Sequence, residues 1–371
     1  MVDPSAFTPP YDRSLASALA SRGVEVELLT SRFLHGPVPD AAGFEVSECF
    51  YRRTGARGPD AVLRLPFKAG EHLLDLAGFG RKVGRDQDLV HYQWLTWPAI
   101  DRHFLPRFRP RVMTAHHVPA GGRGLRRVAR MLDSMDRAIV HTDSSRERLV
   151  RAGLDRDRVA VVPHGAFDYL TRIDPAPLPE PLSGVPAGQP VVLFFGLIRP
   201  YKGLDLLIEA MEAVPGAELW VVGNPRMRHS DLMALRERAG SLPGGSRWVT
   251  RFVDEAEIGP IMERADLMVL PYREADQSGV LYAGLAFGLP MVVTDVGGPG
   301  EVARESGAAV AVAPEDPEAL AAAVGRLVDD PSARAELGAR AAEAARSFYS
   351  WETVASETEA VYESAIARAG R

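Results

Sequence analysis

Short runs of Val, Ile and Leu alternate along the chain with longer segments whose apolar residues recur at helical spacing. This alternation is typical of βαβ units, in which helices cover both faces of a parallel sheet. In the first half it predicts strands at 24–30, 89–93, 111–115, 137–141 and 158–162, and helices at 13–21 and 144–152. The opening Met-Val-Asp resembles the end of a further strand, so either that strand is short or the start codon is misassigned.

The alternation stops at residues 171–189, which contain five prolines and two glycines. No helix or central strand tolerates that density, so we expect an interdomain linker between domains 1–170 and 190–350. After the linker the pattern predicts strands at 191–195, 218–222, 248–252, 267–270, 291–294 and 309–312. Helices are expected at 202–213, 232–239, 255–263, 279–287, 301–304, 317–328, 331–347 and 351–369. The fold class is therefore α/β, with two doubly wound domains and ligands bound in the cleft between them.

Composition and charge narrow the function classes. The 371 residues are 46% hydrophobic and 25% charged, which excludes a disordered chain, and the net charge of −6 argues against a nucleic-acid partner. No apolar run is long enough to span a membrane, and the N-terminus lacks the features of a signal peptide, so we expect a cytoplasmic protein. Cys49 is the single cysteine, which excludes an internal disulfide and a cysteine-rich zinc site. Only three of the 43 basic residues are lysines, so Lys202 stands out.

The turn after the strand at 191–195 carries candidate chemistry. The strand ends at Gly196, the turn holds Arg199, and Lys202 opens the next helix. A guanidinium, an ammonium and helix N–H groups aimed at one point would bind phosphate and would suit the charge on a leaving diphosphate. The alternative is a surface turn with two solvated cations.

A second polar loop follows the strand at 267–270. It leads to a helix that begins near Gly279, where the absence of a side chain lets a ligand approach the backbone. Amides of this turn would hold a second phosphate oxygen, whereas the alternative is an ordinary helix cap by Ser278. The expected donor-side residues of this loop are Gln277, Ser278, Gly279 and Val280. Glu274 is expected either to accept hydrogen bonds from hydroxyls or to be a solvated loop acid. A third loop, Thr294–Glu301, is expected to turn at Gly297-Gly298 before a helix that starts at Glu301.

In the first half, candidate residues occur where strands end. His116 and His117 follow the strand at 111–115, which places His116 at the edge of the sheet where ligands bind. The same reasoning places His117, Tyr11 and Asp12 on the acceptor side. Trp94 is expected on that side too, either for stacking on a sugar or for core packing. The sequence has no GxGxxG after its first strand, no GxxxxGK[ST], no HExxH and no GxSxG. These absences weaken the nicotinamide, P-loop, zinc-protease and hydrolase hypotheses.

Six segments resemble a known family in its own order. They are AIVHTDSSRERL, VAVVPHGAFDYL, FFGLIRPYKGLDLLIEAM, the stretch from ADLMVLPYREADQSGV to VTDVGGPGEV, PEDPEAL and FYSWETVASETEAVY. The chain is similar to the family 4 retaining glycosyltransferases of the GT-B fold. This resemblance implies that Lys202 holds the donor diphosphate, that His116 lies near the sugar and the acceptor, and that the helix at 351–371 packs back on the N-terminal domain.

The chain departs from the family pattern at three positions. Leu197 stands where the family has arginine, and Arg199 is the candidate substitute. The glutamate pair of the family falls on Ala275 and Ala283. Glu274, one residue away from the first, is the candidate catalytic replacement, and the second glutamate has no substitute. Arg251 and Phe252 are expected beside the nucleotide base.

Two further segments are rich in basic residues. Residues 121–132 carry four arginines beside apolar positions, and residues 66–85 carry further lysines and arginines. Both are expected either to lie on anionic lipid at the inner membrane face or to form solvated faces of helices.

We therefore predict a retaining transfer of a sugar from a UDP- or GDP-sugar to a hydroxyl acceptor, which is a saccharide, a lipid-linked molecule or a small molecule. Lys202, Arg199 and the Ser278–Val280 amides would offset the charge of the diphosphate, so no essential metal or other cofactor is expected. The alternatives are a catalytically reduced nucleotide-sugar-binding module, which would bind without turnover, and a two-domain oxidoreductase.

Overall fold

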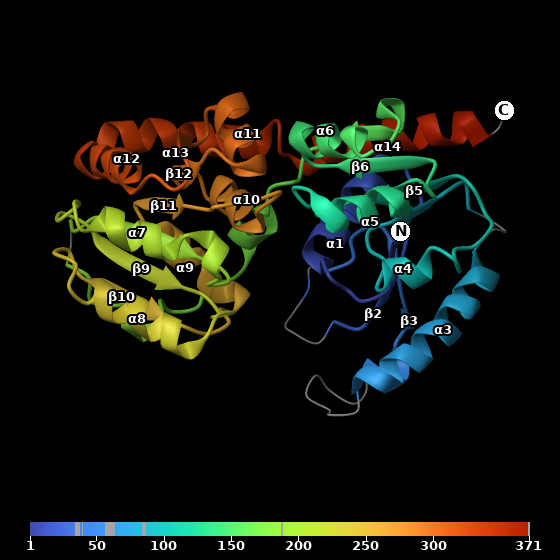
Figure 1. The fold of residues 1–371 in the computed structure, drawn as a ribbon, viewed down its shortest axis with the longest axis horizontal. Coiled ribbons are helices and arrows are strands. Elements are labelled where there is room, and N and C mark those ends of the chain that lie inside the picture. The colour runs from blue at the N-terminus through green and yellow to red at the C-terminus, as the bar shows by residue number, and fades with distance from the viewer. Residues whose placement is uncertain (34–37, 39, 56–63, 84–86, 187, 370–371) are drawn as a thin grey trace. The chain divides into compact units, whose positions relative to one another are not determined.

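The computed structural model describes the whole chain except residues 34–37, 39, 56–63, 84–86, 187 and 370–371. The described chain forms two compact units (Figure 1). The first comprises Met1–Gly165 and Trp351–Arg371, and the second comprises Ala166–Ser350. The boundary at Gly165 lies before the expected one at residue 170.

The first unit is built on a seven-stranded parallel sheet in the order β3-β2-β1-β4-β5-β6-β7. The opening residues do form a short strand, β1. The strands are β1 (Val2–Asp3), β2 (Glu27–Ser31), β3 (Glu45–Phe50), β4 (Val90–Tyr92), β5 (Arg111–Thr114), β6 (Arg137–Val140) and β7 (Val159–Val161). The helices are α1 (Pro9–Ser21), α2 (Arg52–Gly55), α3 (Arg64–Lys82), α4 (Pro98–Asp101), α5 (Gly122–Leu132), α6 (Asp143–Arg151) and α14 (Trp351–Ala369).

The C-terminal helix α14 completes the core of the first unit. Leu15 and Leu19 of α1 are buried in one cluster with Val354 and Tyr362 of α14. The helix begins against Gly165, where an added Cβ would lie 2.5 Å from the Trp351 ring. Helix α14 therefore belongs structurally to the N-terminal part of the chain.

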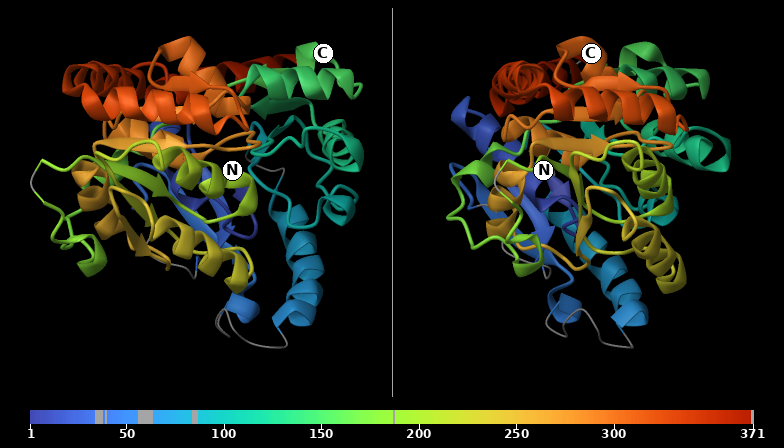
Figure 2. Two further views of the ribbon diagram at one scale, coloured as in Figure 1. Left: turned by 60° about the vertical axis from the view of Figure 1, so that its left-hand side comes forward. Right: turned by 90° about the vertical axis from the view of Figure 1, so that its left-hand side faces the viewer.

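Helix α3 packs on the first unit along one side and exposes the other. Figure 2 shows it, in light blue, at the margin of its own unit, and Phe79 on the packed side enters the core cluster that contains Tyr92. Phe67 and Leu74 on this helix are 50% and 70% exposed. The sequence predicts a helix within residues 66–85, and α3 covers most of that segment. Strand β3 has no predicted counterpart, because it is an edge strand whose residues are mostly half-buried or exposed.

The second unit is built on a six-stranded parallel sheet in the order β10-β9-β8-β11-β12-β13. The order reverses between β8 and β11, which is where such sheets bind ligands. The strands are β8 (Val191–Phe195), β9 (Glu218–Val222), β10 (Ser246–Val249), β11 (Leu267–Leu270), β12 (Met291–Thr294) and β13 (Val310–Val312). The helices are α7 (Leu204–Met211), α8 (His229–Ala239), α9 (Glu255–Arg264), α10 (Gly279–Ala286), α11 (Gly297–Ser306), α12 (Pro317–Asp329) and α13 (Pro331–Arg346).

Both faces of this sheet are buried, because side chains alternate along each strand. On β8, Val191 and Leu193 enter one apolar cluster, whereas Val192 and Phe194 enter the other. The first cluster contains residues of α9, α10 and α13, and the second contains residues of α7, α8 and α12. This burial on both sides explains why the central strands are continuous apolar runs.

Residues 171–189 are part of the second unit, and this corrects their assignment as a linker. Leu182 is buried in the core of the unit. The backbone N–H of Ala176 donates to the carbonyl of Ala256 at 2.8 Å. The Arg247 guanidinium donates to carbonyls of the same segment at 2.7 and 3.3 Å. Apart from short 3₁₀ turns, the segment has no helix or strand, but it is fixed by these contacts.

The turn expected at Gly297-Gly298 is the first turn of α11, which begins four residues before the predicted start at Glu301. A Cβ on Gly297 would lie 1.8 Å from the carbonyl oxygen of Ala275. The glycines therefore let the helix start directly against the preceding polar loop, and they do not mark a chain reversal. Among the described residues no helix is long and apolar enough to cross a membrane.

Candidate functional site

The turn after β8 brings a lysine to the edge of the second sheet. Gly196 ends the strand with φ +102°, and the 3₁₀ turn Pro200–Lys202 follows it. Gly203, with φ +68°, then starts α7, so Lys202 precedes the helix and does not open it as predicted. This turn places the Lys202 side chain beside the loop that follows β11.

Lys202 is a buried cation without an acidic partner. The residue is only 8% exposed, and its Nζ donates a hydrogen bond to the Tyr272 hydroxyl at 3.1 Å. The same Nζ lies 4.8 Å from the centroid of the Tyr272 ring, a cation–π contact. It forms no ion pair with any residue that the structure describes. A buried ammonium with only neutral partners is unfavourable on its own and favourable with a bound anion.

Tyr272 connects this lysine to the helix α10. Its hydroxyl lies 3.1 Å from Ser278 Oγ, and both residues are buried. Ser278 is the N-cap residue of α10, yet its side chain makes no capping hydrogen bond, which excludes the simple capping role. Tyr272 was not identified from the sequence, although its position two residues beyond β11 places it at the ligand-binding edge.

The rest of this loop is held against its own unit. Gln277 Oε1 accepts a hydrogen bond from the Tyr282 hydroxyl at 2.7 Å. An added Cβ on Gly196 would lie 2.8 Å from Val280 Cγ2, so the two turns approach closely at the predicted donor-side residues. Gly279 is exposed at the start of α10. The structure thus brings Gly196, Lys202, Ser278 and Val280 together, as the prediction required of a phosphate site.

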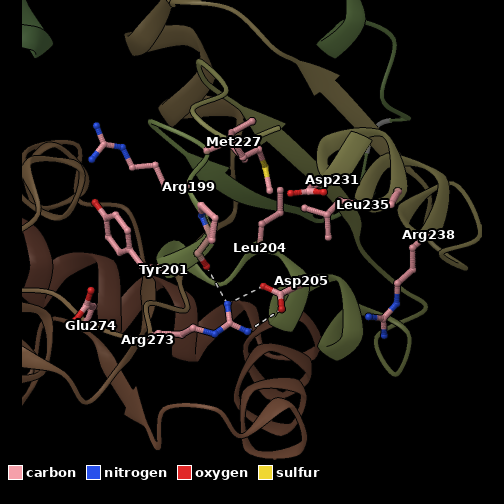
Figure 3. A pocket seen from close by; sticks show the side chains of 13 residues that line it. Arg199, Tyr201, Leu204, Asp205, Met227, Asp231, Leu235, Arg238, Arg273 and Glu274 are labelled. Carbon is pink, nitrogen blue, oxygen red and sulfur yellow. Dashed lines mark hydrogen bonds and ion pairs between the residues drawn. The ribbon is translucent and has the colours of Figure 1, made fainter. Parts of the chain in front are cut away.

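Arg199 and Glu274 lie elsewhere in the unit. Both line a pocket of about 870 Å³ between the start of α7 and α8, together with apolar residues such as Leu204 and Leu235 (Figure 3). Lys202 is not among the lining residues. Arg199 is exposed, and its guanidinium points away from the Arg273–Asp205 ion pair in the same pocket. We expected Arg199 and Lys202 to converge on one point, but Arg199 lines a pocket that Lys202 does not line.

Arg251 and Phe252 follow β10, which ends at Val249, so the strand expected at 248–252 begins and ends earlier. The Arg251 guanidinium forms a two-pronged ion pair with Glu257 at 2.6 and 2.7 Å. This hydrogen-bonded pair raises the pKa of Arg251 and lowers that of Glu257. Phe252 is 57% exposed, which leaves its ring available for stacking at this edge of the sheet.

In the first unit, His116 follows β5 as predicted and is held on both ring nitrogens. Nε2 lies 2.9 Å from Gln93 Oε1, and Nδ1 lies 3.3 Å from His141 Nε2. Trp94 stacks on the imidazole with ring centroids 5.1 Å apart. Burial, and then the neighbouring His141, hold the pKa of His116 well below its usual value, so this imidazole is neutral near pH 7.

Tyr11 is the centre of an aromatic and histidine cluster. Its ring contacts His116, His141, His164 and Trp351, with centroids 4.7 to 5.4 Å apart. Burial lowers the pKa of His164 to about 3. Since the ring is 2% exposed, Tyr11 packs the core and does not line an acceptor site, which corrects the prediction.

Asp12 is also buried, at 1% exposure. Burial, followed by the charge of Asp3, raises the pKa of Asp12 well above its usual range. The carboxyl group therefore has no surface to offer an acceptor, and this second acceptor-side assignment is corrected in the same way. His117, in contrast, is exposed beside His116.

A polar cluster at the edge of the first sheet was not predicted. Ser5 follows β1, Tyr51 follows β3 and Thr96 lies beyond β4. Lys68 of α3 contacts Ser5 and Tyr51, and Thr96 contacts the same two residues. Lys68 Nζ donates to Ser5 Oγ at 3.1 Å and lies 4.4 Å from the Tyr51 ring centroid. Thr96 Oγ1 is 2.9 Å from Ser5 Oγ and 3.0 Å from the Tyr51 hydroxyl. Its members come from elements far apart in the sequence, so only their positions after strand ends could have indicated it.

Comparison with known proteins identifies the family. Residues 189–330 match the model described as glycosyl transferases group 1, and residues 12–166 match the model described as glycosyltransferase family 4. The chain is a group 1, family 4 glycosyltransferase. Lys202, Tyr272 and Ser278 lie in the first match, and His116 lies in the second.

Curated relatives of this glycosyltransferase cover nearly its full length. The D-inositol 3-phosphate glycosyltransferase of Kineococcus radiotolerans is 29% identical and covers 96% of this chain and 90% of the relative. The enzyme of the same name from Corynebacterium glutamicum is 27% identical, with 96% and 91% coverage. The chain is thus an enzyme that transfers a sugar.

Solved structures confirm the GT-B fold of the glycosyltransferase. Sucrose-phosphate synthase from Thermosynechococcus elongatus superimposes with a TM-score of 0.73 at 21% identity, covering 96% of this chain and 93% of that one. HepE from Anabaena, in complex with UDP and glucose, superimposes with a TM-score of 0.72 at 17% identity and covers 98% of both chains.

No metal site is apparent in the described part of the glycosyltransferase. There, no three His, Cys, Asp or Glu side chains gather in a way that would hold an ion.

Proposed function

We propose that the protein transfers a sugar from a UDP-sugar to a hydroxyl acceptor with retention of anomeric configuration. One observation carries the donor assignment: Lys202 is a buried ammonium without a carboxylate partner in the described chain. The sugar diphosphate supplies the missing anion. UDP is chosen over GDP because the structural neighbour HepE is described with UDP and glucose, and retention follows from the family resemblance.

The site offers the diphosphate several fixed donors. The Lys202 ammonium and the amides of Gly279 and Val280 surround the exposed start of α10. An N-terminal helix turn favours negative charge, and fixed donors stabilise the charge that grows as the diphosphate leaves. These groups offset the charge of the diphosphate without an essential metal ion. Arg199 would join them only if its side chain turned from the pocket in which it lies.

The acceptor is proposed to be a phosphorylated polyol, as the name D-inositol 3-phosphate glycosyltransferase gives for the relatives. The cluster of Lys68, Ser5, Tyr51 and Thr96 supports this class, because an ammonium with nearby hydroxyls suits a phosphate group. Ser5, Tyr51 and Thr96 follow strands of the first sheet, at the edge where such sheets bind ligands, and Lys68 of α3 contacts them there. His116 would orient a hydroxyl of the sugar or the acceptor by exchanging its Gln93 partner for it.

The test is a transfer assay with UDP-, GDP-, ADP- and dTDP-sugars as donors. Each donor is offered separately with inositol phosphate, with free inositol and with water as the acceptor. Every reaction is run with and without a chelator. We expect UDP release that depends on both a UDP-sugar and a phosphorylated acceptor, an α-linked product in the proton NMR spectrum from an α-linked donor, and no effect of the chelator. Inversion at the anomeric carbon would contradict retention. UDP binding without turnover of any acceptor would instead support a catalytically reduced binding module.

We further propose that the protein contacts the cytoplasmic face of an anionic membrane through α5. Arg126 and Arg127 are exposed, and α5 contains no acidic residue. The apolar side of the helix is occupied within its own unit, since Met131 and Leu132 belong to the core. The contact is therefore electrostatic, at about 1 kcal/mol for each arginine near the surface. Residues 84–86 of the other basic segment lie outside the described residues.

Binding to vesicles that contain anionic phosphatidylglycerol should show this contact. The wild type should sediment with the vesicles at low salt and dissociate as the salt concentration rises. Arg126→Glu/Arg127→Glu should abolish sedimentation without loss of transfer to a free acceptor. The control, Arg236→Glu/Arg326→Glu, makes the same charge change on exposed faces of α8 and α12. Equal loss in both double variants would reduce the effect to net charge and refute a role for α5.

A further inference from the structure

The contacts of Tyr272 favour one direction for its hydrogen bonds. The Lys202 ammonium has only hydrogens to offer, so the Tyr272 oxygen must accept from it at 3.1 Å. Ser278 Oγ, also at 3.1 Å, is the neighbour to which the single hydrogen of the Tyr272 hydroxyl can go, although either oxygen of this pair can be the donor. Donation by Tyr272 is the more favourable direction, because Tyr272 is the more deeply buried of the two residues and an unpaired buried hydrogen is costly. In this direction Ser278 Oγ accepts from Tyr272, and its own hydrogen is left to donate elsewhere.

We propose that Tyr272 is a positioning residue that sets Lys202 and Ser278 as two hydrogen-bond donors for the leaving diphosphate. This inference rests on the proposed donor site, and it adds a residue and a direction to it. The Ser278 hydroxyl does not cap α10, so it is available at the start of the helix where the anion is proposed to bind. Tyr272 itself need not touch the substrate.

The surroundings of Tyr272 make this direction stable. Tyr272, Ser278 and Lys202 are 1%, 6% and 8% exposed, so water does not readily replace any of the three in this series of hydrogen bonds. The Tyr272 carbonyl accepts from Thr294 Oγ1 at 2.5 Å, which fixes the backbone. The adjacent N–H of Arg273 donates to the carbonyl of Tyr201 at 2.8 Å, which ties the loop to the lysine-bearing turn.

The chain of hydrogen bonds should matter most in the transition state. A charged donor polarises the groups that are bonded to it, and bonds of this kind strengthen in a buried site. The negative charge on the diphosphate grows as the bond to the sugar breaks, so fixed donors stabilise the transition state more than the bound donor. A loss of direction at Tyr272 should therefore lower kcat more than it raises KM for the donor.

The experiment compares Tyr272→Phe, Ser278→Ala and their double variant in the full-length enzyme. Loss of a hydrogen bond to a charged group predicts a fall in kcat of roughly 10- to 100-fold for each single variant, with a smaller change in donor KM. Because both substitutions interrupt the same series of hydrogen bonds, the double variant should be no slower than the slower single variant. Ser278→Thr keeps the hydroxyl and should restore most of the rate.

The matched control is Tyr282→Phe, which removes another buried tyrosine hydroxyl that bonds to the same loop through Gln277. Wild-type kcat in Tyr272→Phe, additive losses in the double variant, or an equal loss in Tyr282→Phe would each overturn the proposal. Failure of the donor site is a separate result: the wild type itself would then show no UDP binding that depends on Lys202.

Discussion

Removal of the Lys202 ammonium is expected to reduce kcat/KM for the UDP-sugar roughly 100- to 1000-fold, the range seen when one fixed donor to a developing anion is lost. Lys202→Met keeps the length of the side chain and its contact with the Tyr272 ring, but it loses the charge. Because the ammonium has no acidic partner in the described chain, its removal should not destabilise the free protein. The signature is thus an active-site defect in a protein that is at least as stable as the wild type.

Thermal unfolding with and without UDP separates these effects. A ligand at about 100 times its Kd stabilises the wild type by about 2.7 kcal/mol, and Lys202→Met should lose most of that shift. Arg199→Ala is the comparison, since Arg199 is exposed and lines the pocket that excludes Lys202. We expect it to lower kcat/KM less than Lys202→Met does. A larger loss in Arg199→Ala would show that this arginine takes over the family role in the bound state.

The central strands of the second unit were predictable from the sequence to the residue. The predicted bounds at 191–195, 218–222, 267–270 and 291–294 are those of β8, β9, β11 and β12. These strands are buried on both faces, so they are continuous apolar runs that polar segments delimit. The α/β class and the GT-B fold followed from them and from the resemblance, and both are confirmed.

Elements at the margins were harder to predict because their residues face both core and solvent. Strand β3 at the edge of the first sheet has only one buried residue, Phe50. The 171–189 segment has the composition of a linker, but hydrogen bonds from Arg247 and Ala176 fix it to the second unit. These bonds join positions far apart in the chain, and no local pattern reveals them.

The candidate site shows the same division. Lys202 and Ser278 were identified because each lies in a turn that follows an apolar strand. Tyr272 was missed because its role depends on two partners, one of them 70 residues away. Tyr11 was misjudged for a different reason: it lies near the start of the first helix, as expected, but the ring is covered by the histidines around it.

Gly203→Ala should damage stability and donor binding together. The residue adopts φ +68°, which costs an alanine about 1–2 kcal/mol. In addition, the new Cβ would lie 2.0 Å from the carbonyl oxygen of Pro271, a backbone atom that cannot rotate away. Overpacking of this kind typically adds about 1–3 kcal/mol. We expect this sum as a loss of unfolding free energy in denaturant titration.

Gly184→Ala isolates the clash from the backbone strain. Gly184 lies in the same unit with φ +76°, and nothing lies within 4 Å of its added Cβ. This variant should pay only the cost of the left-handed conformation and should bind UDP like the wild type. Gly203→Ala should lose about 1–3 kcal/mol more, and it should also weaken UDP binding, because relief of the clash separates the Lys202 turn from the Tyr272 loop. If the two variants were equally stable and bound UDP equally well, the close approach of these two loops would not be what holds Lys202 in place.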